Sequence, residues 1–378
     1  MSNSPFKFKI MNNNRNFDYE PGVKRTYTPE EAGHEKFRRP VSRQHRKRKH
    51  SINMGALIIV LAFAVIIGVC IAVLLGGRDD TVDPNEGNGL TDSNGSVLMT
   101  EADTEPPVEI EVTVTSEQMH MGNLILVNRF YPYTFADEEV GEIVSVGNYK
   151  NDNYVVRDNS IQLRKSTVDI FNGMMDDMFA ATGFNYLQVN SAYRSYDDQV
   201  STYEYYVEQN GEEYAKTYVA NPGNSEHHTG LALDLNVNRD GAISYVESDD
   251  DCAWFRENCD EYGFVLRYTE DKYYITGIKG ETWHYRYVGV PHASIMTEMN
   301  MCLEEYTDYI KGFTQDTYAL MYDGESMNKA EYDPEFESGY MIYYVPSAGE
   351  ETVIKVPNNA EYEISGNNVD GYVVTVAK

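Results

Sequence analysis

The stretch SEHHTGLALDLNV, residues 225–237, decides how the rest of the chain is interpreted. Its second half alternates, so that its three leucines would lie on one face of a β-strand and Asp234 on the other. A carboxylate on a strand with apolar residues on both sides must be paired, hydrogen-bonded or bound to a cation. We therefore predict a strand at Leu231–Val237 that carries a functional carboxylate.

His227 stands at the entrance of this predicted strand, where its imidazole could point at the same spot as Asp234. Histidine nitrogen and aspartate oxygen are two of the ligand types that zinc accepts. A second stretch, ETWHYRY (residues 281–287), offers His284 as a third ligand. Alone, either histidine would be an ordinary core or surface residue, so the prediction depends on all three residues coming together.

Glu281 precedes His284 by three positions, so the two side chains cannot share a face of one regular strand. We predict that Glu281 lies in the turn before a strand at Trp283–Val288. A carboxylate there, close to a metal but not bound to it, can act as the general base for a water molecule.

Arg194 lies between a predicted strand, Tyr186–Asn190, and a predicted helix. The helix begins with the capping-box sequence Ser195-Tyr196-Asp197-Asp198 and extends to about Gln209. An arginine at this junction could hold a carboxylate or stabilise the anion of a transition state. Alone, it would most often be a surface charge. His228 is predicted to be structural.

These motifs resemble those of the VanY-type zinc D,D-carboxypeptidases. The pattern S-x-H-x-x-G-x-A-x-D, preceded by Y-R-S and followed by E-x-W-H, carries the resemblance, which covers about residues 120–310. The resemblance implies a single bound Zn²⁺ and, as substrate, the peptidoglycan stem peptide that ends in D-Ala-D-Ala. The implied site residues are the zinc ligands His227, Asp234 and His284, the catalytic residues Glu281 and Arg194, and the substrate-binding residues Arg194, Ser225 and Gln199.

The leading hypothesis is therefore a hydrolase, a zinc-dependent metallopeptidase that removes the C-terminal D-Ala from stem peptides. The same site could serve an L,D-carboxypeptidase that acts on tetrapeptide stems, or a VanX-like D,D-dipeptidase. A cell-wall-binding module that keeps the fold without catalysis is a further alternative. The complete set of metal ligands and base argues against that module.

The charge distribution divides the chain around an uncharged segment. Residues 1–50 hold 13 Lys and Arg against 5 Asp and Glu, whereas residues 78–378 hold 18 against 55. Between them, Met54–Gly77 runs for 24 residues without a charge, which is long enough for a transmembrane helix. The acidic body would be repelled by phosphate backbones, so nucleic acid is not an expected partner.

The basic flank before this segment sets the expected orientation. By the positive-inside rule, we predict a single-pass protein of the cell membrane with a cytoplasmic N-terminus and an extracytoplasmic catalytic domain. The predicted parts are a cytoplasmic tail (1–53), a transmembrane helix (54–77), a flexible acidic linker (78–117), the catalytic domain (118–311) and a small β-rich appendage (312–378).

The catalytic domain is predicted to be α+β, with helices packed on a central antiparallel sheet that holds the zinc site. The appendage is interpreted as a packing extension, with a cell-wall or partner-binding module as the alternative. A disulfide between Cys259 and Cys302 is also predicted. The other elements expected from the sequence are a strand at Asn123–Val127, helices at Ser166–Ala181, Glu212–Val219 and Trp254–Tyr262, and strands at Tyr340–Val345, Thr352–Val356, Tyr362–Ser365 and Tyr372–Val376.

Overall fold

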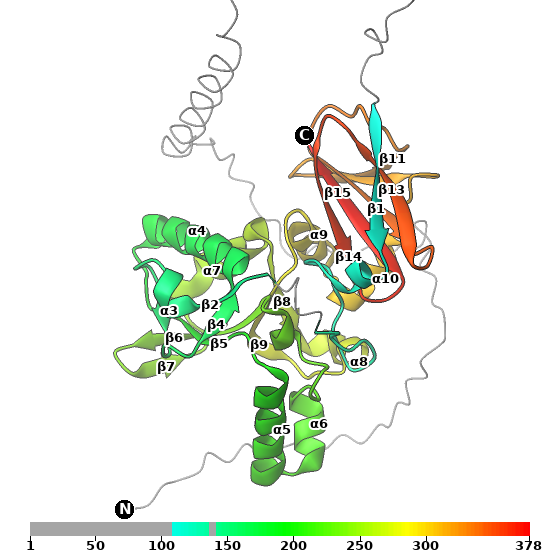
Figure 1. Cartoon of the computed structure of the whole chain (residues 1–378). Coiled ribbons are helices and arrows are strands. Elements are labelled where there is room, and N and C mark those ends of the chain that lie inside the picture. The colour runs from blue at the N-terminus through cyan, green and yellow to red at the C-terminus, as the bar shows by residue number, and fades with distance from the viewer. Residues whose placement is uncertain (1–107, 136–140) are drawn as a thin grey trace, which may run out of the picture. The chain divides into compact units, whose positions relative to one another are not determined.

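The computed structural model describes residues 108–135 and 141–378, which are coloured in Figure 1. The predicted cytoplasmic tail, the transmembrane segment Met54–Gly77 and most of the predicted linker lie outside the described residues. Within the described part of the chain, no helix combines the length and apolar character that crossing a bilayer requires. The described elements confirm a mixed α+β structure.

A six-stranded sheet carries the predicted site residues. Its strand order is β3-β5-β6-β9-β8, and β7 pairs with β6. β3 pairs parallel with β5, and the other pairs are antiparallel as predicted. The strands span Val155–Val156 (β3), Leu187–Ser191 (β5), Ala232–Arg239 (β6), Ala242–Ser244 (β7), Phe264–Tyr268 (β8) and Glu281–Tyr287 (β9).

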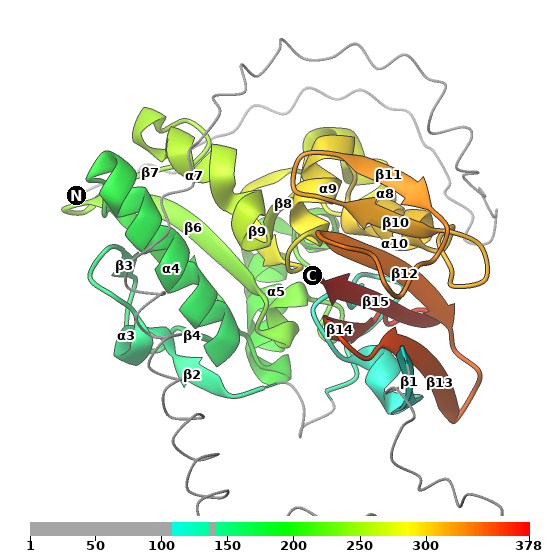
Figure 2. The same cartoon turned by 90° about the horizontal axis from the view of Figure 1, so that it is seen from above.

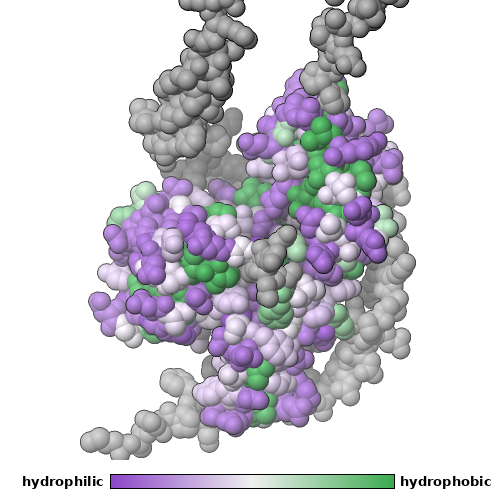
Figure 3. All heavy atoms as spheres, viewed as in Figure 1, coloured by the Kyte–Doolittle hydropathy of each residue, from purple (hydrophilic) through white to green (hydrophobic). Residues whose placement is uncertain are grey.

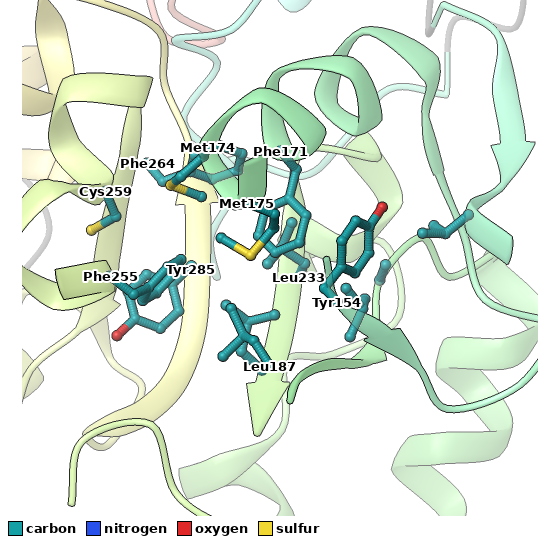
Figure 4. Packing of buried hydrophobic residues seen from close by; sticks show 14 of the residues in the cluster. Tyr154, Phe171, Met174, Met175, Leu187, Leu233, Phe255, Cys259, Phe264 and Tyr285 are labelled. Carbon is teal, nitrogen blue, oxygen red and sulfur yellow. The ribbon is translucent and has the colours of Figure 1, made fainter. Parts of the chain in front are cut away.

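One face of this sheet is covered by the helix α4, Lys165–Thr182, whose apolar residues have the helical spacing expected from the sequence. Phe171 of α4 and Leu233 of β6 belong to the core shown in Figure 4. Gly183 ends the helix with a left-handed φ of 73°, as predicted. Because side chains alternate along β6, Asp234 points to the opposite face of the sheet.

Apart from α5, which has 15 residues, the other helices of the catalytic part are short. A capping box between Ser195 and Asp198 begins α5, as predicted. The predicted helix Trp254–Tyr262 is divided into α7 and a 3-10 turn, η4, which ends at Gly263. The helices and turns span Glu117–His120 (η1), Val146–Tyr149 (α3), Tyr196–Asn210 (α5), Glu212–Tyr218 (α6), Glu226–Thr229 (η2), Asp250–Cys252 (η3), Ala253–Asn258 (α7), Cys259–Tyr262 (η4), Glu270–Lys272 (η5), Tyr273–Thr276 (α8), His292–Met299 (α9) and Leu303–Ile310 (α10).

Two further sheets lie toward the C-terminus, and a small pair of strands accompanies the catalytic sheet. The larger sheet has five antiparallel strands in the order β11-β10-β12-β15-β14, and the second pairs β1 with β13. The four strands predicted in the appendage are confirmed as β12 to β15. The remaining strands span Glu109–Thr115 (β1), Ile143–Ser145 (β2), Gln162–Arg164 (β4), Ala319–Tyr322 (β10), Met327–Ala330 (β11), Tyr340–Pro346 (β12), Glu351–Pro357 (β13), Glu361–Gly366 (β14) and Gly371–Ala377 (β15).

β1 lies inside the segment predicted to be a flexible linker, so that prediction is wrong for Glu109–Thr115. The strand pairs with β13 along its whole length. Its alternating residues Ile110, Val112 and Val114 pack against the core of the C-terminal strands. Glu111, between them, is exposed. The segment is acidic in composition, but its apolar residues alternate with polar ones as in a half-buried β-strand.

The inner strands of the five-stranded sheet, β10, β12 and β15, are buried on both faces, and one face packs on the catalytic part. Ile342 of β12 belongs to the same core as Val265 of β8 and Leu303 of α10. Its neighbour Met341 points the other way, into the core shared with β1 and β13. Figures 1 and 2 both show α9 between β8 and the C-terminal strands. This continuous core supports the interpretation of residues 312–378 as a packing extension.

The predicted strand Asn123–Val127 is wrong, although the segment is buried. Its backbone groups bond to side chains and to a turn instead of to a neighbouring strand. The guanidinium of Arg286 donates from Nη2 to the carbonyls of Asn123 and Ile125, at 2.9 and 3.0 Å. Asn368 donates to the carbonyl of Leu126 at 2.8 Å. An apolar run can thus satisfy its backbone without a sheet when buried polar side chains reach it.

The predicted disulfide between Cys259 and Cys302 is also wrong, because both residues are free thiols in this structure, as is Cys252. Cys259 packs in the core beneath α4, whereas Cys302 stands at the N-cap of α10. Burial raises the pKa of the Cys259 thiol to about 12. The cysteines therefore act as small apolar core residues.

Much of the molecular surface is polar. Figure 3 shows that the face seen in Figure 1 is mostly hydrophilic, with an apolar patch over the C-terminal strands. Val353 of β13, among the exposed apolar residues, leaves 55% of its surface accessible.

Candidate metal and catalytic site

Asp234 and His284 meet across neighbouring strands. They are directly paired in the antiparallel register of β6 and β9, and His284 Nδ1 lies 3.2 Å from Asp234 Oδ1. His227 Nε2 lies 3.5 Å from the other carboxylate oxygen, Oδ2. One ligand atom from each of the three residues lies within 4.8 Å of the others. The structure therefore brings the three predicted metal ligands together.

His227 is held by the turn that precedes β6. It lies in η2, where Ser225 Oγ accepts the backbone N–H of His227 at 3.4 Å. Gly230 ends the turn with φ of 66°, and a Cβ at that position would lie 2.8 Å from Cδ1 of Ile143. The ring nitrogen Nδ1 of His227 lies 2.6 Å from the carbonyl oxygen of Ala192. Donation from Nδ1 to this carbonyl leaves the lone pair of Nε2 free to bind a metal.

His284 is held in the same way by a carboxylate. Its Nε2 lies 3.3 Å from Oε2 of Glu226, which is 1% exposed. The other ring nitrogen, Nδ1, faces Asp234 and lies 3.6 Å from Oε2 of Glu281. Each histidine thus has one ring nitrogen, the outer nitrogen, in contact with a hydrogen-bond acceptor away from Asp234: Nδ1 of His227 and Nε2 of His284. The other ring nitrogen of each histidine, the inner nitrogen, is directed at Asp234.

Glu281 reaches the site by a route that differs from the prediction. It is the first residue of β9 and pairs with Tyr268, not a residue of the preceding turn. The register shifts between the pairs Leu266–Tyr285 and Tyr268–Glu281, so β9 has extra residues at this point. In a regular strand, residues three positions apart point to opposite faces, but this rule does not hold across the irregularity. Glu281 can therefore approach His284.

The electrostatic surroundings of Glu281 suit proton transfer. Its carboxyl is 8% exposed, and burial raises its pKa to about 8, with the charge of Asp234 acting in the same direction. For Asp234, burial alone would raise the pKa, but His227 and His284 hold it below its usual value. The two carboxyl groups therefore have opposite protonation tendencies, as acid–base and ligand roles require.

Arg194 is fixed at the edge of the site through its side chain and its backbone. Its guanidinium donates from Nη1 to Gln199 Oε1 at 2.7 Å and from Nη2 to Ser191 Oγ at 3.1 Å. Its backbone N–H donates to the carbonyl of His227 at 3.1 Å. Nδ1 of His228 lies 2.7 Å from the carbonyl of Arg194. Two consecutive residues of η2, His227 and His228, therefore hold this arginine close to the candidate metal ligands.

The two other residues predicted to bind substrate are buried. Gln199 is 1% exposed, and its amide lies between Arg194 and the carbonyl of Ala220, to which Nε2 donates at 2.7 Å. Ser225 is 3% exposed and caps η2. In the structure, Gln199 therefore contacts Arg194 and Ser225 contacts His227. Substrate contact by either residue stays a prediction.

Glu226, as a partner of His284, was missed by the sequence analysis, whereas His228 braces Arg194, which agrees with its predicted structural role. Glu226, between Ser225 and His227, has no role among the predictions made from the sequence. A usable indication was present elsewhere, because Arg267 interrupts the otherwise largely apolar strand β8. A charge in such a strand requires a buried counter-charge.

The three ligand candidates fit a zinc ion by an observation independent of their sequence spacing. Asp234 Oδ1 is buried and has no hydrogen-bond partner among the described residues. Buried carboxylate oxygens are rarely left in this state unless an ion or water occupies the space. Two imidazole nitrogens and one carboxylate oxygen form a donor set typical of catalytic zinc sites.

Comparisons with known proteins agree with this geometry. The family model VanY, described as D-alanyl-D-alanine carboxypeptidase, matches residues 160–290. A D-alanyl-D-alanine carboxypeptidase of Enterococcus faecium is 38% identical over 268 residues, which are 70% of this chain and 78% of that protein. The bifunctional D-Ala-D-Ala dipeptidase and carboxypeptidase VanXYC of Enterococcus gallinarum is 41% identical over 135 residues, 33% of this chain and 67% of that protein.

A solved structure shares the fold well beyond the catalytic motifs. The vancomycin-resistance D,D-dipeptidase VanXYg, crystallised with a D-Ala-D-Ala phosphinate analogue, superimposes with a TM-score of 0.61 and 34% identity. The match covers 72% of this chain and 100% of that one. The similarity in sequence and structure, together with the converging histidines and carboxylates, shows that this chain belongs to the VanY-type D-alanyl-D-alanine carboxypeptidase family.

Proposed function

We propose that this carboxypeptidase depends on zinc and removes the C-terminal D-Ala from peptidoglycan stem peptides that end in D-Ala-D-Ala. The observation that carries the proposal is the convergence of His227, Asp234 and His284 around an unpartnered carboxylate oxygen, with Glu281 3.6 Å from His284. A base beside three such donors is an arrangement that supports metal-assisted hydrolysis of an amide bond.

The three donors would hold the ion, which when bound supplies a Lewis acid for the scissile carbonyl. Glu281 would take the proton of the attacking water and return it to the leaving amine. Because burial raises the pKa of Glu281 to about 8, its carboxyl can exchange a proton near neutral pH.

Arg194 would recognise the anionic part of the substrate. Two of its N–H groups are used by Gln199 and Ser191, and a guanidinium has five. The remaining donors are available to the terminal carboxylate or to the oxyanion that forms when water attacks. The fixed position of this side chain reduces the ordering cost of binding.

We also propose that the enzyme is anchored by Met54–Gly77, with its catalytic domain outside the membrane. The support is the uncharged run of 24 residues and the basic segment that precedes it. An outward-facing catalytic domain would be on the same side of the membrane as the cell wall that contains its substrate.

The test is a product analysis with the full chain. Stem pentapeptide, stem tetrapeptide and free D-Ala-D-Ala are incubated with the enzyme, with and without a metal chelator. Release of D-Ala from the pentapeptide that stops with chelator and returns with Zn²⁺ is the expected result. Release from the tetrapeptide alone would favour the L,D-carboxypeptidase, and no release from any substrate would leave the cell-wall-binding module.

A D,D-dipeptidase is a second candidate function, favoured by a specific observation. VanXYC is described as both a dipeptidase and a carboxypeptidase. The structure of VanXYg, whose whole chain is covered by the match, was solved in complex with a D-Ala-D-Ala phosphinate analogue. Cleavage of free D-Ala-D-Ala at a rate similar to that of the pentapeptide would assign both activities to this chain. A pentapeptide rate at least about a hundredfold higher, which corresponds to about 2.7 kcal/mol of transition-state discrimination, would assign the carboxypeptidase alone.

A further inference from the structure

We propose that Glu226 is a positioning residue that fixes the protonated nitrogen of His284, so that Nδ1 is presented to the metal. This role rests on the proposed metal site. It adds to that site a residue that neither binds the metal nor touches the substrate.

The two oxygens of the Glu226 carboxylate have different partners. Oε1 accepts from Nε of Arg267 at 2.8 Å and from Nη1 of Arg286 at 2.9 Å. Oε2 lies 3.3 Å from Nε2 of His284. A carboxylate can only accept, so this contact requires the proton of His284 to be on Nε2.

The carboxylate cannot easily rotate out of this arrangement. The side chains of Glu226, Arg267 and Arg286 are 0% exposed. A rotation that broke either arginine contact would leave a buried charge without its counter-charge, which is costly. The arginines are themselves anchored, since Arg267 also binds Glu304 through two N–H groups and Arg286 binds backbone carbonyls of the segment 123–125.

The consequence for His284 is a choice between two tautomers. With the proton on Nε2, the lone pair of Nδ1 faces Asp234 at 3.2 Å and can bind a metal. With the proton on Nδ1, that lone pair is lost. His227 has its outer nitrogen fixed by a backbone carbonyl, whereas His284 depends on a side chain that a substitution can change.

Glu226→Gln is the decisive substitution because it nearly preserves shape and reverses one hydrogen bond. The amide oxygen would stay with the two arginine donors, so the amide NH₂ would face Nε2 of His284. A donor there makes Nε2 the acceptor and moves the proton to Nδ1. We expect the affinity for Zn²⁺ to fall by about 10- to 100-fold, the range typical for removal of a histidine's outer partner.

Glu304→Gln is the matched control. Glu304 belongs to the same network, since it accepts two N–H groups from Arg267, and no hydrogen bond or ion pair links it to His284 in the described structure. The Glu304→Gln substitution removes the same negative charge from the network but leaves the contact that sets the tautomer of His284 unchanged. Its Zn²⁺ affinity is expected to stay within about threefold of wild type, since it leaves the outer-nitrogen contact of His284 intact.

The experiment measures Zn²⁺ affinity by competition with a chromophoric chelator, for the wild-type full chain and both variants. Equal affinities for Glu226→Gln and wild type, or equal losses in both variants, would overturn the positioning role. If the wild-type chain bound no Zn²⁺ at its histidines, the metal site itself would be rejected, and this role with it.

A second measurement does not depend on whether Glu226→Gln folds. Long-range ¹H–¹⁵N spectra of the zinc-loaded wild-type chain, labelled in histidine, identify which ring nitrogen of His284 carries the proton. A slowly exchanging proton on Nε2 is the expected result. A proton on Nδ1, with Nε2 bound to the metal, would contradict the proposal.

Discussion

His284 of β9 lies directly across from Asp234 of β6, with Nδ1 3.2 Å from Oδ1. This pairing places the ligands from two distant parts of the sequence on one face of the sheet, while the other face packs beneath α4. Because the strands are held by their own ladder and by that core, the ligand positions do not depend on flexible loops. Such a rigid base is what a preorganised metal site requires.

The first prediction concerns the metal. A chain with both His227→Ala and His284→Ala is expected to lose the single bound zinc, because only one protein ligand remains. His120→Ala, a histidine outside the site that pairs with Asn368, is the control and is expected to keep the metal. Metal analysis of the purified proteins decides the matter, and full zinc in the double variant would refute the ligand assignment.

Glu281→Gln is expected to keep zinc and fold while losing nearly all turnover. A positioned general base contributes about 10²- to 10⁴-fold to the rate. The exposed Glu261→Gln serves as control and should leave the rate unchanged. The measurement is kcat on stem pentapeptide together with zinc content. If Glu281→Gln still turned over within about threefold of wild type, another group would have to be the base.

Arg194→Lys tests the planar fork of the guanidinium at constant charge. Lysine has one ammonium nitrogen in place of the separate Nη1 and Nη2 that bond Gln199 and Ser191, so it cannot reproduce this geometry while also presenting a planar fork to a carboxylate. We therefore expect kcat/KM to fall by about 10²-fold or more. Arg157→Lys, at an exposed ion pair, is the control. Zinc content and Tm are measured alongside. Loss of activity through unfolding, or no loss, would return Arg194 to a structural role.

The core between the catalytic part and the C-terminal strands predicts that neither is stable alone. Ile342→Ala is expected to lower the free energy of unfolding by about 2–5 kcal/mol, because the side chain is 0% exposed in that core. Val353→Ala, on an exposed position of β13, should change it by less than about 0.5 kcal/mol. Denaturant unfolding measures both, and two separate transitions in the wild type would show that the sheet is an independent module.

A pH dependence of stability is expected from the β6–β7 hairpin. A hydrogen bond from Arg239 lowers the pKa of Asp249 to about 2 from an ordinary 3.8. This carboxylate therefore adds stability that is fully present above pH 4 and is lost as the pH falls toward 2.

In Asp249→Asn, we expect about 1 kcal/mol less stability at pH 7, with the difference from wild type disappearing as the pH falls through and below the folded-state pKa of about 2. Asp240→Asn, at the exposed turn between β6 and β7, is the control. Denaturant unfolding at several pH values compares the three chains. A pH-independent difference would show that Arg239 does not stabilise the charged form.

The sequence by itself determined the elements whose cause is local. The spacing of apolar residues predicted α4, the capping box at Ser195 predicted the start of α5, and strict alternation predicted β6. The candidate metal ligands could be predicted for a related reason, because these residue types stand close together or at the ends of predicted strands.

Only the tertiary structure decided the features that depend on contacts between distant segments. The irregular register of β9 brought Glu281 into the site, and no local pattern encodes where a ladder shifts. The buried Arg286 turned an apolar run into a loop instead of a strand. Glu226 became a partner of His284 because two buried arginines, 41 and 60 residues away, fix its carboxylate. Burial and counter-charge are properties of the folded chain, so a residue's neighbours in sequence do not reveal them.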